Sequence, residues 1–456
     1  MMAPSWRLGL ASMVAAAWML PAALRAQGSR TCDVVVDSTL GVGRKVDIGQ
    51  GRFRFYAGGG VWAHCKGQIT KMHSDSVAWY PEFDRFDMVG GVTFRDSAVN
   101  LNSQRATYVL NQERLDAYGN AVLRNLVTGS VLTGPTITYL RRAQGVRDSA
   151  ELIAPNRPTV RYLAVGDTAG APPWVITSDR LRLVGNTEAW AGGNVRIRRE
   201  DFDAHSDSAR LNVDAGGGRL VGHARVEGSG GGTQPDAAGY TLTGRNIDFK
   251  IDGKKLTWVQ AEDSSLATSA DWRLSADTIA FDIENDQVQG GEAWGDSLTS
   301  TASSVGQTIT ADSLVIAAPD QQLTEVRGIG AARAVAKRDS TDADPDWVVG
   351  DTVIARFDST GGGRRGLVGL AALGKAGARY RVYEADQPTK LAGIDYSRGD
   401  RITAHFTGAA IERVDVAGNA DGVYLQVPAT TADSTAPKAP AADSVATPRP
   451  GTGGGG

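Results

Sequence analysis

The sequence is poor in the residues and motifs on which most protein chemistry depends. Among 456 residues there are two cysteines and five histidines, and no histidine stands in a metal-binding spacing such as HExxH or a Cys/His cluster. No GxSxG elbow occurs, and the phosphate-loop-like stretch Gly369–Ala376 has alanine where a magnesium-binding serine or threonine belongs. These absences predict a protein that is not an enzyme and that uses neither a metal nor a cofactor.

The sequence also lacks an excess of one charge and a second long apolar run. Lysine and arginine number 48 against 51 aspartates and glutamates, so we expect no binding of nucleic acid. The one long apolar run, Leu8–Leu20, follows Arg7 and precedes small residues up to Ala26. This pattern predicts a secretory signal that is cleaved after Ala26. An uncleaved membrane anchor is the alternative, although the run is short for a spanning helix.

The two cysteines, Cys32 and Cys65, both follow the signal and lie in strand-like segments. Because exported proteins meet an oxidising compartment, we expect one disulfide that ties down the N-terminal end of the fold. Two buried free thiols are the alternative.

What the sequence does have is a repeated phrase: a small or hydroxyl-bearing residue, an aspartate, and then apolar residues at every second position. A period of two places those apolar residues on one face of a β-strand. A second strand-like stretch, broken by glycine, follows each phrase, as Gly192-Gly193 follows Asp179. The phrases begin at Ser74-Asp75, Ser178-Asp179, Ser206-Asp207, Ala276-Asp277, Ala311-Asp312, Gly350-Asp351 and Gly399-Asp400, with degenerate copies at Gln104, Pro135 and Arg245.

The repeat predicts an elongated all-β array in which each unit contacts its neighbours. The 56 glycines recur where a strand must bend or bulge. We interpret the aspartates as marking the rim where a strand leaves its turn, because the nine-residue phrase of calcium-binding β-rolls is absent. No segment has helical periodicity.

Composition predicts the limits of the array. We expect a signal peptide over residues 1–26, a first β array over 27–154 and a proline-rich loop over 155–173. A second β array, continuous with the first, is expected over 174–427. The Pro/Ala/Gly tail, residues 428–456, has too little apolar character to fold.

The phrase and its answering strand resemble the OstA-like (LptA) family of periplasmic lipopolysaccharide-transport proteins. The chain is longer than the typical bridge protein of that family and has more copies and proline-rich inserts, which leaves open which component of the pathway it is. The resemblance covers most of residues 60–425 and is carried by Ser74–Gly91, Ser178–Val195, Ser206–Gly222, Ala276–Gly291, Ala311–Gly328, Gly399–Ala420 and the answering strand Gly119–Val122.

The resemblance implies a jelly roll or solenoid of stacked, bent antiparallel strands in the periplasm. In it, an apolar groove would shield the acyl chains of lipopolysaccharide or a related glycolipid and carry them from the inner to the outer membrane. Unpaired edge strands would add to other components of the transport pathway, or to a second copy end to end.

We expect the groove to be lined by the apolar columns that follow the repeat phrase. A closed core made by the same side chains is the alternative reading, as is a structural or adhesive β-solenoid of the cell envelope without lipid cargo. A carbohydrate-active solenoid enzyme fits least, because the aspartates are regularly spaced and not clustered. The expected lining residues are Trp79, Tyr108, Leu110, Ile137, Tyr139, Leu181, Leu183, Leu211, Val213, Ile279, Phe281, Leu314 and Ile316.

Overall fold

The computed structural model describes residues 32–427 apart from several short gaps. The predicted signal peptide and the tail over 428–456 lie outside the described residues. Within the described part of the chain, no helix has the length and apolar character needed to span a membrane. The gaps are 144, 164–171, 200–201, 213–214, 229–238, 253–254, 271, 286, 320–321, 338–341, 361–363, 385–386 and 408–409.

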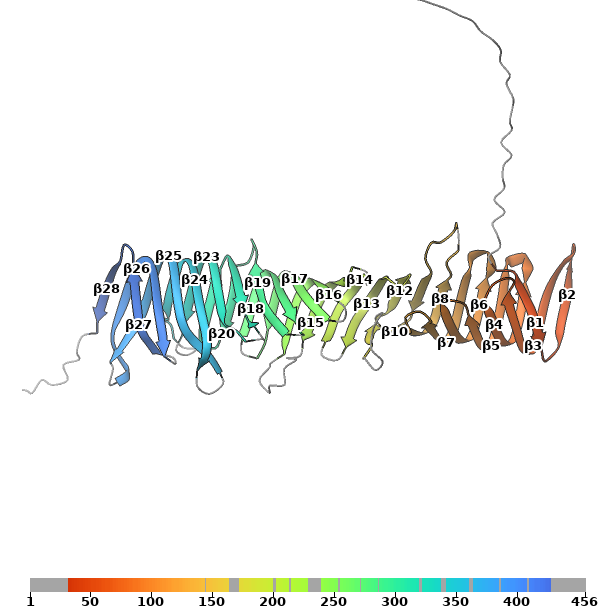
Figure 1. Ribbon diagram of the computed structural model, residues 1–456, viewed down its shortest axis with the longest axis horizontal. Coiled ribbons are helices and arrows are strands. Elements are labelled where there is room, and N and C mark those ends of the chain that lie inside the picture. The colour runs from red at the N-terminus through yellow and green to blue at the C-terminus, as the bar shows by residue number, and fades with distance from the viewer. Residues whose placement is uncertain are drawn as a thin grey trace, which may run out of the picture. The chain divides into compact units, whose positions relative to one another are not determined.

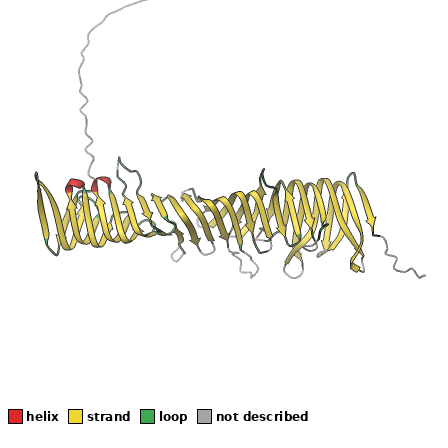
Figure 2. Cartoon of the chain, turned by 180° about the vertical axis from the view of Figure 1, so that it is seen from behind, coloured by secondary structure: helices red, strands yellow, loops and turns green. Residues whose placement is uncertain are grey.

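The all-β prediction is confirmed: strands account for most of the described residues (Figure 1). Two short 3-10 turns, η1 (Pro81–Phe83) and η2 (Leu110–Gln112), are the helical segments drawn in red in Figure 2. The described residues form two compact units, unit 1 up to Val221 and unit 2 from Gly222.

The boundary between the units lies inside strand β15 (Gly217–Gly228) and not in the expected loop over 155–173. That loop prediction is also wrong in part, because Thr159–Tyr162 forms strand β10. The other strands of unit 1 are β1 (Val34–Thr39), β2 (Gly43–Gly49), β3 (Arg52–Cys65), β4 (Lys71–Tyr80), β5 (Arg85–Arg95), β6 (Val99–Val109), β7 (Arg114–Asn125), β8 (Val131–Leu140), β9 (Glu151–Pro155), β11 (Trp174–Thr177), β12 (Arg180–Val184), β13 (Glu188–Arg199) and β14 (Phe202–Asn212).

Unit 2 continues the same pattern of strands along the chain. They are β16 (Tyr240–Asp252), β17 (Lys255–Thr268), β18 (Trp272–Glu284), β19 (Gln287–Trp294), β20 (Ser300–Ser304), β21 (Gln307–Ala311), β22 (Ser313–Ala317), β23 (Glu325–Ala336), β24 (Asp346–Thr360), β25 (Arg364–Glu384), β26 (Gln387–Thr407), β27 (Ala410–Ala417) and β28 (Asp421–Gln426).

The longer strands bend near their middle, so their two halves belong to two limbs of the unit. In β5, residues Arg85–Val89 lie in what we call limb B, and Val92–Arg95 lie in limb A. Both halves pair antiparallel with β4 and with β6. Elsewhere two short strands replace one bent strand: β8 pairs with β9 in limb B and with β10 in limb A. Each unit is therefore a stack of bent layers.

Apolar side chains fill the space between the limbs. Phe94 of limb A meets Tyr108 and Tyr139 of limb B, with ring centroids 5.7 and 6.2 Å apart. In unit 2, Tyr240 and Trp272 of limb A meet Phe281 of limb B at 6.1 and 6.4 Å. Burial of such side chains is the main contribution to stability, so the interior between the limbs is the core.

The repeated aspartate lies at the bend between the limbs, inside one strand in most copies and between two short strands at Asp179 and Asp312. Its predicted place at a strand rim is wrong for the copies inside a strand. Asp75 lies inside β4, where pairing with β5 is interrupted between His73 and Ser76. Its carboxylate lies against Gly90, whose φ of 80° suits glycine. Asp179, Asp312, Asp351 and Asp400 lie in the same way against Gly193, Gly330, Gly374 and Gly418.

In the copies that have serine before the aspartate or its replacement, the serine hydroxyl supports the bend. Ser74 is fully buried, and its hydroxyl donates a hydrogen bond to the carbonyl oxygen of Ser76 across the bend (3.0 Å). Ser103, Ser178 and Ser206 each donate to the carbonyl two residues later at 2.9 Å. Since a bend takes carbonyls out of the strand ladder, the serine satisfies one of them. The phrase therefore specifies a corner.

Candidate functional site

The structure gathers the predicted lining residues into a few rows on limb B. In unit 1, one row of cross-strand partners contains Trp79, Tyr108, Tyr139, Leu183 and Leu211 together with Phe55, Phe86, Leu115, Leu152 and Ala189. Ile137 and Leu181 belong to the next row toward the bend, where Ile137 pairs with Ala117 and Leu181 with Ala191.

Unit 2 repeats this arrangement. Ile279 and Leu314 both pair with Ala293, and Phe281 and Ile316 both pair with Gly291. The prediction for Leu110 needs correction, and the prediction for Val213 is not tested. Leu110 is buried in the 3-10 turn η2 and is not part of a strand, because the chain turns there to begin the next layer. Val213 lies outside the described residues.

Burial varies along these rows. Tyr108, Leu110, Ile137, Tyr139, Leu181, Ile279, Phe281 and Leu314 are buried, whereas Trp79, Leu183, Leu211 and Ile316 are half-buried. In unit 1, Phe86, Tyr108 and Leu115 have no exposed surface. The row becomes half-buried at Phe55 and Trp79 on one side and at Leu152 and Leu183 on the other. The middle of unit 1 is thus packed closed, and the interior is more accessible on either side of it.

The sequence reasoning missed the facing wall of the interior. In limb A of unit 1 an unbroken buried row contains Ala63, Met72, Phe94, Leu101, Leu123, Leu132, Val160, Ile176, Ile197 and Ala204. The signal was present, because apolar residues alternate after each glycine pair, as Val92 and Phe94 do after Gly91. The prediction followed only the column after each aspartate.

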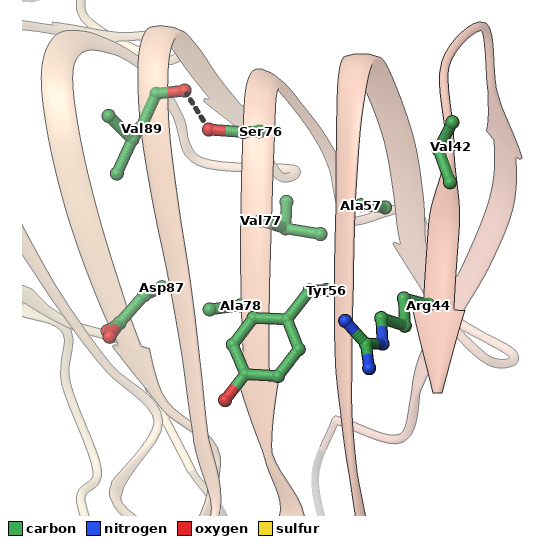
Figure 3. Close-up of a pocket in the computed structure, with 9 residues that line it drawn as sticks. All are labelled: Val42, Arg44, Tyr56, Ala57, Ser76, Val77, Ala78, Asp87 and Val89. Carbon is green, nitrogen blue, oxygen red and sulfur yellow. Dashed lines mark hydrogen bonds between the residues drawn. The ribbon is translucent and has the colours of Figure 1, made fainter. Parts of the chain in front are cut away.

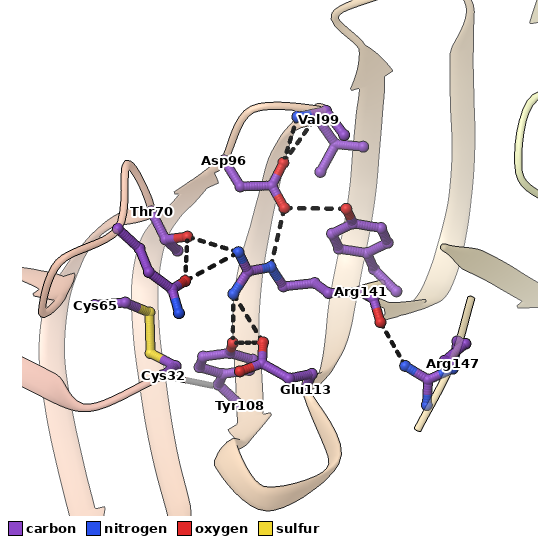
Figure 4. A network of polar contacts seen from close by, with 12 residues as sticks. Cys32, Cys65, Thr70, Asp96, Val99, Tyr108, Glu113, Arg141 and Arg147 are labelled. Carbon is purple, nitrogen blue, oxygen red and sulfur yellow. Dashed lines mark hydrogen bonds and ion pairs between the residues drawn. A yellow bond between two sulfur atoms is a disulfide. The ribbon is translucent and has the colours of Figure 1, made fainter. Parts of the chain in front are cut away.

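Arg141 closes the mouth of unit 1, by which we mean the gap between the free ends of the two limbs. It follows β8 at the end of limb B, and its Nε donates to Asp96 at the end of limb A (3.1 Å). Its Nη1 donates to Glu113 (2.7 Å), and its Nη2 donates to the hydroxyl of Thr70 (2.9 Å). Figure 4 shows these bonds converging on one guanidinium group. The network therefore joins the limbs by charge-assisted hydrogen bonds.

Two buried phenols complete this network. The hydroxyl of Tyr108 donates to Glu113 (2.5 Å), and the hydroxyl of Tyr139 donates to Asp96 (3.0 Å). Burial, with the neighbouring carboxylate, raises the pKa of each phenol well above its usual range. Burial also opposes the charge of Arg141, but Tyr108, Glu113 and Asp96 outweigh it and raise the arginine pKa. Arg141 is therefore held as a cation between the side chains of Asp96 and Glu113.

The expected disulfide is present: Cys32 is bonded to Cys65, with their Cα atoms 5.0 Å apart. It joins the residue just before β1 to the last residue of β3 and lies beside the Arg141 network in Figure 4. The free-thiol alternative is excluded, since the described chain has no free cysteine. The cross-link fixes the first layer of unit 1.

A shallow pocket of about 390 Å³ lies where β2 meets the first bent strands (Figure 3). Its polar lining includes Arg44, Tyr56 and Asp87. Asp87 already accepts hydrogen bonds from Arg85 and Thr107, both at 2.8 Å. Ser76 also donates to the carbonyl oxygen of Val89 (3.4 Å), so two of the polar groups that line the pocket already have partners.

The described residues contain no group of three or more His, Cys, Asp or Glu side chains that could hold a metal ion. A search against protein-family models and a search of curated proteins each found no match. The OstA-like resemblance therefore stays a prediction, and the geometry of the apolar interior is the basis for any functional proposal.

Proposed function

We propose that this protein is a periplasmic carrier that shields the acyl chains of lipopolysaccharide, or of a related glycolipid, between its two limbs. The observation that supports this proposal best is the pair of facing apolar rows, one on each limb, that follow the stack from layer to layer. Each methylene that leaves water for such an interior gains about 0.8 kcal/mol, so a chain with many methylenes would be held without any bond chemistry.

Acyl chains would enter where the interior is least closed. Leu183 and Leu211 in unit 1 and Ile316 in unit 2 point to the same interior as the buried residues of their rows but stay half-buried. In the middle of unit 1 the aromatic side chains and the Arg141 network fill this space. A lipid that passed there would have to part the limbs.

The proposal extends to a bridge between the inner and outer membranes, with other transport components as partners. The disulfide suits the oxidising periplasm. All six residues of β28 are exposed, and it pairs with β26 in limb A. Such a strand is a template for strand addition by a partner or by a second copy end to end.

A second candidate is a structural or adhesive β-solenoid of the cell envelope that carries no lipid. The complete burial of Phe86, Tyr108 and Leu115 favours it, because side chains that already fill an interior at crystal-like density leave no room for cargo. The two candidates differ in whether lipid ever contacts the inward-facing residues.

Photocrosslinking in cells tests the proposal. A photoreactive residue would replace the inward-facing Leu183 or Ile316, with the exposed neighbours Arg182 and Val315 on the opposite face as matched controls. We expect lipopolysaccharide adducts at Leu183 and Ile316 and none at the controls. Adducts to protein alone at the inward positions would reject the carrier and favour the structural candidate.

A further inference from the structure

A row of unpaired cations follows the outer face of limb A in unit 1, at the ends of its strands. Lys71 pairs across the ladder with Arg95, Arg95 with Asn100, and Asn100 with Arg124. Val131 is in turn the cross-strand partner of Arg124 on one side and of Arg161 on the other. The four cations are exposed, and none forms an ion pair with any described residue. We call Lys71, Arg95, Arg124 and Arg161 the basic row.

On the outer face of limb B, four arginines are engaged in ion pairs, whereas Arg105 forms none with the described residues. There Arg54 binds Glu82 (2.6 Å), Arg85 binds Asp87 (2.8 Å), Arg114 binds Asp116 (2.9 Å) and Arg182 binds Glu151 (2.5 Å). From β4 to β11, neither the basic row nor the row beside it contains a carboxylate. Between β4 and β11 the positive charge of the basic row is therefore not compensated by carboxylates in these two rows; beyond them His64 pairs with Asp37, and Arg196 and Arg198 pair with Asp203.

The basic row also carries a cost to the fold. Lys71 and Arg95 are direct cross-strand partners, and like charges placed opposite each other destabilise a sheet. A neutral residue at either position would remove this repulsion. The arrangement is accounted for if an anion lies over the row.

The neighbouring row on the same face is rich in groups that bind sugars. It contains Thr93, Asn102, Thr133, Thr159 and Thr177, and it begins at Trp62 and His73. The indole of Trp62 is 40% exposed and lies 4.6 Å from the imidazole of His73. Hydroxyl and amide groups can hydrogen-bond to sugar hydroxyls, and an exposed indole offers a flat apolar face.

We propose that this face of limb A binds a phosphorylated saccharide, with phosphates on the basic row and sugar hydroxyls on the threonine and asparagine row. Strands are about 4.8 Å apart, so Arg95, Arg124 and Arg161, each two strands from the next, repeat at about 10 Å. That repeat suits phosphates carried on successive sugars. The identification of the saccharide as the headgroup of the carried glycolipid rests on the proposed function. The affinity of the basic row for a phosphorylated saccharide is argued from the charge pattern alone.

The test compares two variants with the same change in net charge. One has Lys71→Gln, Arg95→Gln, Arg124→Gln and Arg161→Gln, and the control has Arg54→Gln, Arg85→Gln, Arg114→Gln and Arg182→Gln. The probe is the phosphorylated saccharide released from lipopolysaccharide by removal of its acyl chains, and the readout is its dissociation constant at low and physiological salt.

We expect the basic-row variant to bind this saccharide at least tenfold more weakly than the unmodified protein, and the control to change less than threefold. Salt should weaken binding by the unmodified protein, because it screens exposed charges. The single variant Arg124→Gln, which disturbs no ion pair, should show a smaller loss and serves if the fourfold variant fails to fold. Equal losses in both fourfold variants would overturn the proposal.

Two further outcomes would also overturn it. One is equally tight binding of the dephosphorylated saccharide. The other is binding of phosphatidylglycerol vesicles, but not of the saccharide, through the basic row, which would identify a membrane surface as the occupant. Photocrosslinking at Leu183 in the basic-row variant separates the two proposals. Lipopolysaccharide adducts at Leu183 in this variant would support the carrier proposal whatever the saccharide measurement shows. The saccharide measurement then tests the headgroup site alone.

Discussion

The carboxylate of Asp75 occupies the space that a side chain at Gly90 would need. The two residues lie on neighbouring strands at the point where both strands bend. Gly90 has a φ of 80°, which glycine adopts without strain. The same relationship joins Asp179 to Gly193, so a contact between two strands underlies the repeat in the sequence.

Replacing Gly90 by alanine should destabilise unit 1 by about 2–3 kcal/mol, from the strain of a positive φ and from the collision with Asp75. Gly67 is the matched control, because its φ is 72° but a Cβ atom there meets nothing within 4 Å. Gly67→Ala should therefore cost only about 1 kcal/mol. Urea unfolding followed by circular dichroism gives both free energies. If the two variants lose equal stability, the contact with Asp75 is unimportant.

Replacing Arg141 by methionine should destabilise unit 1 by about 3–5 kcal/mol, because two buried carboxylates lose their cation. The side chains of Asp96 and Glu113 are 3% and 2% exposed. Arg182→Met, which breaks an ion pair whose arginine is half exposed, should cost about 1 kcal/mol or less. The free energy of unfolding in urea distinguishes these values. A similar small loss for both would mean that the mouth network does not hold the limbs together.

Stability should fall in alkali because of the two buried phenols. Burial raises the pKa of Tyr108 and Tyr139 above the ordinary value of about 10, so the folded state holds these protons more tightly than the unfolded chain does. Their contribution is then complete below about pH 10 and is lost as the pH rises further. The double variant Tyr108→Phe/Tyr139→Phe should show a flatter dependence in urea unfolding between pH 8 and pH 11. An unchanged slope would assign the loss to other groups.

Reducing the disulfide should destabilise unit 1 by about 2–4 kcal/mol, the usual effect of opening a loop of this size. Cys32 and Cys65 are 33 residues apart in sequence. We expect the melting temperature of unit 1 to fall on addition of a reductant, and the Cys32→Ala/Cys65→Ala variant to show the same fall without it. A variant that melts at the temperature of the oxidised protein would contradict the expectation.

The sequence predicted the strand content and the corners for a physical reason. A period of two is a direct consequence of strand geometry, and the Ser74-Asp75 phrase and the Gly90-Gly91 pair can each be read locally. The two cysteines could be paired because there was only one way to pair them.

Other features depend on contacts between distant residues and were not readable. Arg141 meets Thr70 and Asp96 from the opposite limb, and no short motif announces that meeting. The limb A row, including Phe94 and Leu101, was missed because its alternation precedes the aspartate or follows the glycine pair. The basic row emerges only from the register that places Lys71 opposite Arg95, since the cations are scattered along the chain.

Along β4 to β7 of unit 1, a strand with a polar residue at its bend alternates with a strand that has glycine at its bend. This alternation has a consequence for how such a chain can change in length. The corner at Asp75 in β4 faces the glycine pair of β5, and Gln104 in β6 likewise lies against Gly119 of β7. A hairpin of two strands therefore carries one corner of each kind. Removing β5 and β6 together would bring Asp75 opposite Gly119. This would be a contact between an aspartate and a glycine, like the one that Asp75 already makes with Gly90. The hairpin is thus the unit in which this protein could be lengthened or shortened by duplication or loss without turning its interior face outward.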